Sequence, residues 1–361
     1  MDIPAAGDLM DAVSALPAAA PLLPRLAQRP GIHLVAGAVR DLLLGGAPSD
    51  LDLVVEGDAV EVSLSLGGEI RVHDRFGTCT VTLEGYSYDL ATARRERYPA
   101  PGALPEVEPA TLDEDLLRRD FTVNALTIAL GGADRGALRA APHGLEDLGA
   151  RRLRVMHDAS FIDDPTRLLR LVRYGTRLGF AHEPHTEALA RQAVERGVLS
   201  TISGSRLGTQ LRLLAQEPDP IRALAGLRPL AIDRAIQPRF GLDDEELGRR
   251  AIDLLGENGR RDLLALAVAA RHVPENELEQ LLASLSFQAG DRDVVLTAAT
   301  RADEVARALH EARRPSEVAR AVAGAGPELV ALAGALGPRD AAQDWLQRIR
   351  HVRLAIDGED L

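Results

Sequence analysis

Two aspartates one residue apart, Asp50 and Asp52, have the spacing that metal chemistry needs. They lie at the start of an apolar run over residues 51–55, which we expect to be a strand, and every second side chain of a strand points to the same side. Adjacent carboxylates repel each other unless a cation lies between them, and hard oxygen ligands at this spacing suit Mg²⁺. Asp-x-Asp is common, and alone it is more often a solvated strand end than a metal site. The segment ahead of it decides between these two interpretations.

That segment is Gly37-Ala38-Val39-Arg40-Asp41, and it follows an expected strand over residues 32–36. In a helix expected over residues 39–44, the amide groups of the first turn can face a phosphate, and Arg40 adds a guanidinium fork there. Since this arrangement comes only a few residues before the aspartate pair, the two together favour a nucleotide and metal site.

A second polar cluster lies in the run Asp115-Leu116-Leu117-Arg118-Arg119-Asp120-Phe121-Thr122-Val123-Asn124-Ala125. Arginine can hold phosphate, and aspartate and asparagine can recognise sugar hydroxyls. Arg119, Asp120 and Asn124 are therefore candidates for binding a nucleoside triphosphate. An ordinary helix N-terminus capped by Asp120 is the alternative, and it is compatible with that role.

A third feature is a helix expected from Asp163-Asp164-Pro165 to about Gly179, with acids at its cap and proline in its first turn. Its arginines are three or four residues apart, which places them on about one third of the helix circumference. We call them the arginine stripe: Arg167, Arg170, Arg173 and Arg177. Such a stripe favours a bound anion. A solvated basic face paired with glutamates of a neighbouring helix is the alternative.

The elements that must position these residues change character along the chain. Apolar runs over residues 69–72, 79–83 and 86–91 predict further strands, which indicates an α+β first part. From about residue 160 the apolar residues follow a helical period and strand patterns end. We therefore expect an N-terminal helical segment (1–30), a head (31–150), and a helical neck (151–220), body (221–320) and tail (321–361).

Composition narrows the class of protein. The 361 residues, 46% of them apolar, indicate several globular domains. The sequence contains no run of about 18 apolar residues, so we expect no membrane-spanning helix. The N-terminus lacks the basic segment of a signal peptide, and the single Cys79 allows neither a disulfide nor a zinc cluster, which fits a reducing cytosol. The net charge of −12 argues against a general nucleic-acid coat, yet residues 151–212 carry eleven arginines against six acids.

Four motifs in this order resemble the class II tRNA nucleotidyltransferases and bacterial poly(A) polymerases: G-A-V-R-D, D-L-D, R-R-D-F-T-V-N-A and D-D-P-T-R-L-L-R-L-V-R-Y-G-T-R-L-G-F. The stretch from Asp89 through Y-P-A-P-G-A-L-P-E-V-E-P to L-D-E-D-L resembles them too. The resemblance covers roughly residues 30–215, and several motifs at compatible spacing make it specific.

The resemblance implies a polymerase-β-like head followed by neck, body and tail helices. It also implies an enzyme that adds C, C and A to the tRNA 3′ end from CTP and ATP with Mg²⁺. In such an enzyme Asp50 and Asp52 hold the metal, and Asp89 is a candidate third carboxylate. The remaining implied roles are triphosphate contacts (Gly37, Arg40), nucleotide and sugar contacts (Arg119, Asp120, Asn124) and an amino-acid template for the base (Asp164 and Arg167, supported by Arg170 and Arg173).

The template role agrees with hydrogen-bonding chemistry. Cytosine and adenine each present an amine donor beside a ring-nitrogen acceptor, whereas uracil and guanine present the reverse. Asp164 only accepts hydrogen bonds and Arg167 only donates them. The pair therefore fits C and A and opposes U and G.

The chain departs from the family pattern in three places. Asp163 stands where glutamate is usual, and Ser205 and Gln210 replace acids after the neck, which puts ion pairs there in doubt. The final Gly358-Glu359-Asp360-Leu361 resembles a motif that relatives usually follow with more tail. Neither these departures nor the composition indicates an oligomeric state.

Several functions compete with CCA addition. An A-only enzyme stays open, whereas a complete loop over residues 92–111 disfavours a CC-only enzyme and the absence of a strongly basic C-terminal extension disfavours a poly(A) polymerase. A catalytically dead RNA-binding relative is disfavoured by the intact aspartates, and a small-molecule nucleotidyltransferase by the arginine stripe. We expect the tRNA acceptor arm to follow the neck and to reach Arg348, Arg350 and Arg353, through contacts to phosphate and 2′-hydroxyl groups.

Overall fold

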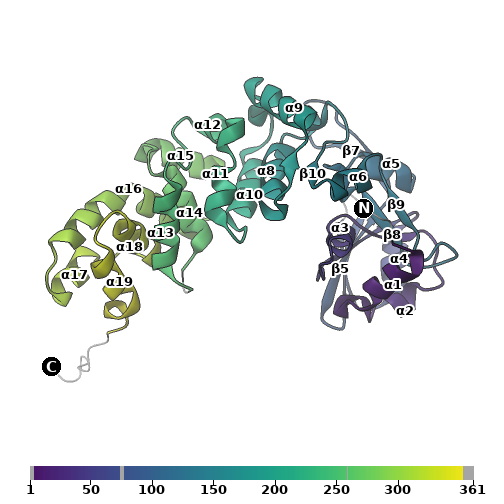
Figure 1. Ribbon diagram of the computed structural model, residues 1–361, viewed down its shortest axis with the longest axis horizontal. Helices are drawn as coiled ribbons and strands as arrows, with labels where there is room; N and C mark the ends of the chain where they lie inside the picture. The colour runs from purple at the N-terminus through teal and green to yellow at the C-terminus, as the bar shows by residue number, and fades with distance from the viewer. Residues whose placement is uncertain (1–3, 74–76, 258, 353–361) are drawn as a thin grey trace. The chain divides into compact units, whose positions relative to one another are not determined.

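The computed structural model describes residues 4–73, 77–257 and 259–352. Contacts within these residues define two compact units (Figure 1). Unit 1 comprises the residues up to Asp164 together with Gly179–Leu189, and unit 2 comprises Pro165–Leu178 together with the residues from Ala190 onward. The five-part division expected from the sequence stays a prediction.

A mixed seven-stranded sheet forms the core of unit 1, in the strand order β3-β4-β5-β2-β1-β8-β9. Strand β2 runs parallel to β5, and the other neighbours are antiparallel. Alternation of buried and half-buried residues along β4 explains why this sequence forms a strand with one face in the core. The strands are β1 Ile32–Val35, β2 Leu51–Val55, β3 Glu69–His73, β4 Thr78–Leu83, β5 Tyr86–Thr92, β8 Leu126–Ala129 and β9 Leu138–Ala140. The predicted α+β head is confirmed.

Short helices accompany this sheet, among them an N-terminal pair that buries leucines and a methionine in the core of unit 1. They are α1 Ala6–Ser14, η1 Pro17–Ala19, α2 Leu23–Leu26, α3 Gly37–Leu43, α4 Ala59–Leu66, α5 Leu112–Leu117, η2 Thr122–Asn124, α6 Gly144–Gly149 and α7 Ser160–Asp163. Helix α9 (Pro184–Glu195) begins in unit 1 and ends in unit 2.

Two small sheets of unit 1 were not predicted. The proline-rich loop over residues 92–111 contains a hairpin of β6 (Arg94–Arg97) and β7 (Glu106–Pro109). Its cross-strand ion pairs, such as Arg95 with Glu108, favour this pairing. Strands β10 (Arg152–Leu153) and β11 (Ala181–His182) pair in parallel. The prediction that strands end by residue 160 is therefore wrong at β11, because two residues are too few to show alternation.

Unit 2 is helical throughout its described residues, as predicted. Helix α14 is buried on nearly all sides, which explains its unbroken run of leucine, alanine and valine. The helices are α8 Thr166–Leu178, η3 Val198–Thr201, α10 Gly204–Ala215, α11 Pro220–Ala225, η4 Arg228–Leu230, α12 Ile232–Ile236, α13 Glu245–Leu255, α14 Arg261–Ala270, α15 Glu275–Ser284, α16 Ala289–Glu311, α17 Pro315–Ala321, α18 Pro327–Ala335, α19 Arg339–Gln347 and η5 Ile349–His351. Across the described parts of both units, none of the helices is both long and apolar enough to cross a membrane.

Candidate active site

The two aspartates of the Asp-x-Asp motif lie where β2 begins. Asp50 and Asp52 are both exposed, whereas Leu51 and Leu53 between and after them are buried. The strand therefore anchors itself through its leucines and leaves its carboxylates on the open face, as alternation predicts. On the parallel neighbour β5, Asp89 lies directly opposite Asp52.

Electrostatics at Asp52 favour a bound cation. Although Asp52 is accessible at the surface, the surrounding protein displaces much of the water near it, and this desolvation raises the pKa of Asp52. Asp89 and Asp50 raise it further, and Arg119 opposes them. A divalent cation would relieve this repulsion, and carboxylate oxygens are the ligands that Mg²⁺ prefers. Across the described residues, no group of three or more His, Cys, Asp or Glu side chains is arranged to hold a metal. Mg²⁺ is commonly held by one or two carboxylates together with water and substrate phosphates, and a pair of carboxylates suits that ion.

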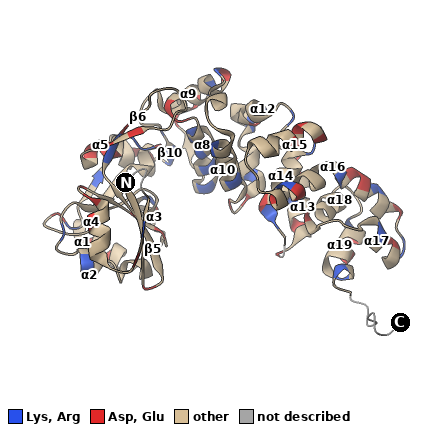
Figure 2. Ribbon diagram, turned by 180° about the vertical axis from the view of Figure 1, so that it is seen from behind, with Lys and Arg blue, Asp and Glu red and all other residues tan. Residues whose placement is uncertain are grey.

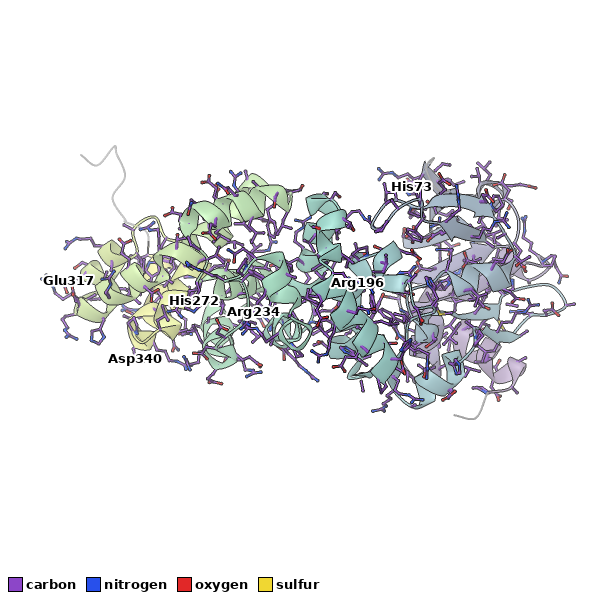
Figure 3. The ribbon with its side chains drawn as sticks, turned by 90° about the horizontal axis from the view of Figure 1, so that it is seen from above. His73, Arg196, Arg234, His272, Glu317 and Asp340 are labelled. Atoms are coloured by element: carbon purple, nitrogen blue, oxygen red, sulfur yellow. The ribbon has the colours of Figure 1, made fainter. Side chains whose placement is uncertain are left out.

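A pocket of about 320 Å³ opens beside this carboxylate. His73, labelled in Figure 3, contacts the hydroxyl of Thr80 through Nε2 at 3.0 Å, and that hydroxyl donates to Oδ1 of Asp89 at 2.6 Å. Asp89 is thus oriented by a neighbour on β4 rather than left mobile. The polar residues of the lining are Asp52, His73, Thr78, Thr80, Asp89, Arg118 and Arg119.

The Gly37 to Asp41 segment forms the turn from β1 into α3. Ala36 in this turn adopts φ 57° and ψ −124°, a backbone conformation that residues with a side chain rarely adopt. Gly37 begins the helix, and Arg40 is 3% exposed. The guanidinium of Arg40 donates from Nη1 to Oδ1 of Asn124 at 2.6 Å and from Nε to Asp41 at 2.8 Å.

The predicted sugar-binding residues are buried together with Arg40. Nδ2 of Asn124 donates to Oδ1 of Asp120 at 3.0 Å, and the same oxygen accepts the amide of Phe121 at 2.8 Å. The alternative of an ordinary helix N-terminus does not hold, because a single 3₁₀ turn, η2, leads directly into β8. The structure thus brings Arg40, Asp120 and Asn124 into one network, whereas Arg119 lines the pocket.

Sequence reasoning missed the carboxylates that hold the pocket arginines. Asp115 is fully buried and accepts hydrogen bonds from Arg118 at 2.7 Å and Arg119 at 2.8 Å. Burial by itself would raise the pKa of Asp115, but the two arginines outweigh it and the pKa is lowered. Glu96 of β6 accepts Arg118 at 2.8 Å, so the hairpin is tied to the same arginine pair. The acids closely spaced with these arginines in sequence were the available signal.

Two arginines of the stripe on α8 pair with one glutamate. Figure 2 shows arginine along α8 and α10. The Nε atoms of Arg173 and Arg177 lie 3.8 and 3.7 Å from oxygens of Glu217, a residue just beyond α10. Burial raises the pKa of Glu217 even though these arginines oppose it. Arg173 and Arg177 therefore pair with a glutamate that follows a neighbouring helix.

Arg167 is the residue of the stripe that is predicted to read the base, with support from Arg170 and Arg173. Arg167 is 4% exposed, and Arg170 stacks on Tyr174 with 5.5 Å between its guanidinium carbon and the ring centre. Asp164 ends unit 1 as the residue that follows α7, and Arg167 lies in the first turn of α8 in unit 2. The template role of this pair stays a prediction.

Two of the three arginines predicted to contact tRNA lie in the described part of the chain. Arg348 is paired with Asp344 at 2.7 Å, and Arg350 lies over the ring of Trp345 at 5.9 Å. Arg353 and the Gly358 to Leu361 motif lie outside the described residues.

A mixed sheet with an Asp-x-Asp pair at the start of a strand, followed by a helical region, defines a polymerase-β-like nucleotidyltransferase. Comparison with known proteins agrees: residues 32–154 match the poly(A) polymerase head domain. Residues 32–154 thus form a poly(A) polymerase head domain, and the chain is similar to tRNA nucleotidyltransferases over a larger part of its length.

Relatives within this family differ in the nucleotides they are named for. The A-adding tRNA nucleotidyltransferase of Geobacter sulfurreducens is 40% identical over 212 residues, which cover 57% of this chain and 24% of that protein. The CC-adding tRNA nucleotidyltransferase of Deinococcus radiodurans is 43% identical over 197 residues, covering 53% of this chain and 52% of that one. The chain thus spans from a quarter to about half of the length of these curated relatives.

A solved structure extends the similarity along the chain. The Thermotoga maritima CCA-adding enzyme, solved in complex with tRNA, matches with a TM-score of 0.79 at 28% identity, covering 98% of this chain and 88% of that one.

Proposed function

We propose that this enzyme adds C, C and A to the 3′ end of tRNA from CTP and ATP in the presence of Mg²⁺. The observation that carries the proposal is the exposed Asp52 carboxylate in a pocket that it shares with Asp89 and Arg119. A dead relative that only bound RNA would have no need of a carboxylate whose pKa is raised by desolvation and by two neighbouring acids.

In the proposed reaction the 3′-hydroxyl oxygen of the RNA attacks the α-phosphorus of the nucleotide, and pyrophosphate leaves. Mg²⁺ held by Asp50 and Asp52 would activate that hydroxyl and neutralise charge on the leaving group. Arg119 lines the pocket and donates to Asp115 at 2.8 Å, and in this proposal its guanidinium binds the triphosphate. Asp89 is held by Thr80 at 2.6 Å and adds a third carboxylate beside Asp52.

Full CCA addition rather than CC addition is supported by the ordered β6–β7 hairpin. Resembling enzymes use the corresponding loop to change the pocket from C to A. Here the loop is intact and tied to the pocket arginines through Glu96, whose carboxylate accepts Arg118 at 2.8 Å. The A-adding enzyme remains the second candidate, since a relative with that name is 40% identical over 57% of the chain.

The proposal is tested with three tRNA substrates: one lacking all of CCA, one lacking only the final A, and one complete. Each nucleotide is supplied separately and then CTP and ATP together. A CCA-adding enzyme adds C to the first, A to the second and nothing to the third. Addition of A to the second substrate alone identifies the A-adding candidate, and a long run of A on any substrate identifies a poly(A) polymerase.

A further inference from the structure

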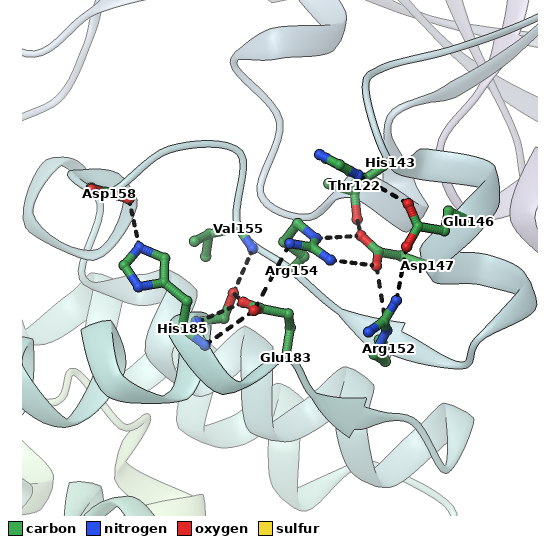
Figure 4. Close-up of polar contacts among 11 residues, drawn as sticks. Thr122, His143, Glu146, Asp147, Arg152, Arg154, Val155, Asp158, Glu183 and His185 are labelled. Carbon is green, nitrogen blue, oxygen red and sulfur yellow. Dashed lines mark hydrogen bonds and ion pairs between the residues drawn. The ribbon is translucent and has the colours of Figure 1, made fainter.

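A fully buried carboxylate lies outside the pocket and has no part in the mechanism above. Asp147, on α6, accepts hydrogen bonds from the hydroxyl of Thr122 at 2.8 Å and from Nε and Nη2 of Arg154 at 2.8 and 3.2 Å (Figure 4). Nε of Arg152 lies 3.6 Å from the same carboxylate. A buried charge is tolerated only when it is paired and hydrogen-bonded, so Asp147 must keep these partners where they are.

The partner that matters is Thr122, the first residue of η2. Its hydroxyl is bound by Asp147, and its amide donates to the carbonyl of Arg154 at 2.9 Å. At the start of α6, a Cβ on Gly144 would lie 3.1 Å from the carbonyl oxygen of Thr122, so helix and turn are in close contact. The ion pair of Asp147 and Arg154 thus holds Thr122 through both its side chain and its backbone.

Two residues further along the same turn lies Asn124. The backbone amide of Asn124 donates to the carbonyl of Phe121 at 2.9 Å. The backbone amide of Ala125 donates to the carbonyl of Thr122 at 3.0 Å. Because a single 3₁₀ turn joins them, a shift of Thr122 moves Asn124 as well. The side chain of Asn124 in turn accepts a hydrogen bond from Nη1 of Arg40 at 2.6 Å and donates one to Oδ1 of Asp120 at 3.0 Å.

We propose that Asp147 is a positioning residue for nucleotide binding: with Arg154 it fixes Thr122, and through the η2 turn it sets Asn124 and Arg40 for the incoming nucleotide. Asp147 is not among the residues that line the pocket. The inference rests on the proposed function, in which Asn124 and Arg40 contact that nucleotide.

The test uses Thr122→Val, which keeps the shape of the side chain and removes the hydroxyl that Asp147 binds. We expect the KM for CTP and for ATP to rise about fivefold to tenfold, as for one lost buried hydrogen bond, with the KM for tRNA unchanged. Thr122→Ser, which keeps the hydroxyl, should restore the wild-type KM. Asp147→Asn should raise the same KM further.

Thr186→Val is the matched control. Thr186 is fully buried, its hydroxyl donates to Glu183 at 2.9 Å and accepts the amide of Val155 at 3.1 Å, and neither Thr186 nor Glu183 belongs to the η2 turn. We expect this variant to lose stability and to keep the wild-type KM for nucleotide.

A purely structural role for the Thr122 hydrogen bond would instead lower kcat through loss of folded enzyme, with the KM for nucleotide unchanged, and this result would overturn the inference. Equal rises in KM for the Thr122 and Thr186 variants would overturn it too. A wild-type enzyme that transfers no nucleotide to any tRNA would contradict the proposed function itself. Failure of the proposed function can therefore be distinguished from failure of the inference about Asp147.

Discussion

Asp52 and Asp89 lie directly opposite each other on the parallel strands β2 and β5, and both line the same pocket. Sequence separates these residues by an intervening helix and two strands, so only the sheet brings their carboxylates together. This pairing makes the site electrostatically unfavourable without a cation, and the first two predictions follow from it.

Asp52→Asn should abolish transfer and, without Mg²⁺, raise the melting temperature at pH 7. The pKa of Asp52 is raised by folding, so the folded chain binds this proton more tightly than the unfolded chain, and ionisation destabilises the fold as pH rises. The gain in melting temperature should shrink as the pH falls toward 3.8, the ordinary pKa of an aspartate. Thermal melts of both proteins across this range, with and without Mg²⁺, check the prediction. A variant that melts lower than wild type at pH 7 would contradict it.

Asp89→Asn should lower the rate of transfer roughly tenfold to a hundredfold, as loss of a residue beside a metal ligand commonly does. The rate should also need more Mg²⁺ to saturate. Asp50→Ala serves as the reference for complete loss, since Asp50 and Asp52 are the proposed metal ligands. Wild-type dependence on Mg²⁺ in the Asp89 variant would exclude it as a third carboxylate.

Asp164→Ala or Arg167→Ala should relax discrimination against UTP and GTP more than it weakens triphosphate binding. The physical reason is that removing one partner of the pair removes the mismatch that rejects U and G. We expect misincorporation to rise at least tenfold, on the order of one lost hydrogen-bond mismatch. Arg177→Ala is a suitable control because Arg177 pairs with Glu217 at 3.7 Å. If both template variants kept the full preference for C and A, the template role would be contradicted and the stripe would be a basic face only.

Shortening the tip of the β6–β7 hairpin within residues 98–105 should impair A addition more than C addition, because it alters the loop that is proposed to change the pocket from C to A. The strands that hold Glu96 against Arg118 are kept. Glu96→Gln should act in the same direction by weakening this link. Single-turnover rates with CTP on tRNA lacking CCA, and with ATP on tRNA lacking only A, measure the two steps. Equal losses in both rates would count against a switching role for the hairpin.

Local patterns predicted much of the fold and part of the site. The strand carrying Asp50 and Asp52 could be predicted because buried Leu51 and Leu53 alternate with the carboxylates. The hairpin could not be predicted, because its proline and glycine content is typical of an irregular loop.

Residues that depend on tertiary contacts were missed. Glu217 lies forty residues beyond Arg177 in sequence, so no helical period relates them. Asp115 and Asp147 look like surface acids at the sequence level. The spacing of Asp115 from Arg118 and Arg119 was the one local signal, and burial with arginine partners distinguishes both acids. Such carboxylates organise the site from outside the motifs that identify it.

The most direct test of the account is the sequence of the 3′ ends formed on a tRNA lacking CCA, incubated with CTP, ATP and Mg²⁺. The account predicts that wild-type enzyme produces ends that finish in CCA and then stop, and that Asp52→Asn produces none. Ends that stay unextended, that stop at CC, or that continue as runs of A would contradict CCA addition as the function of this chain.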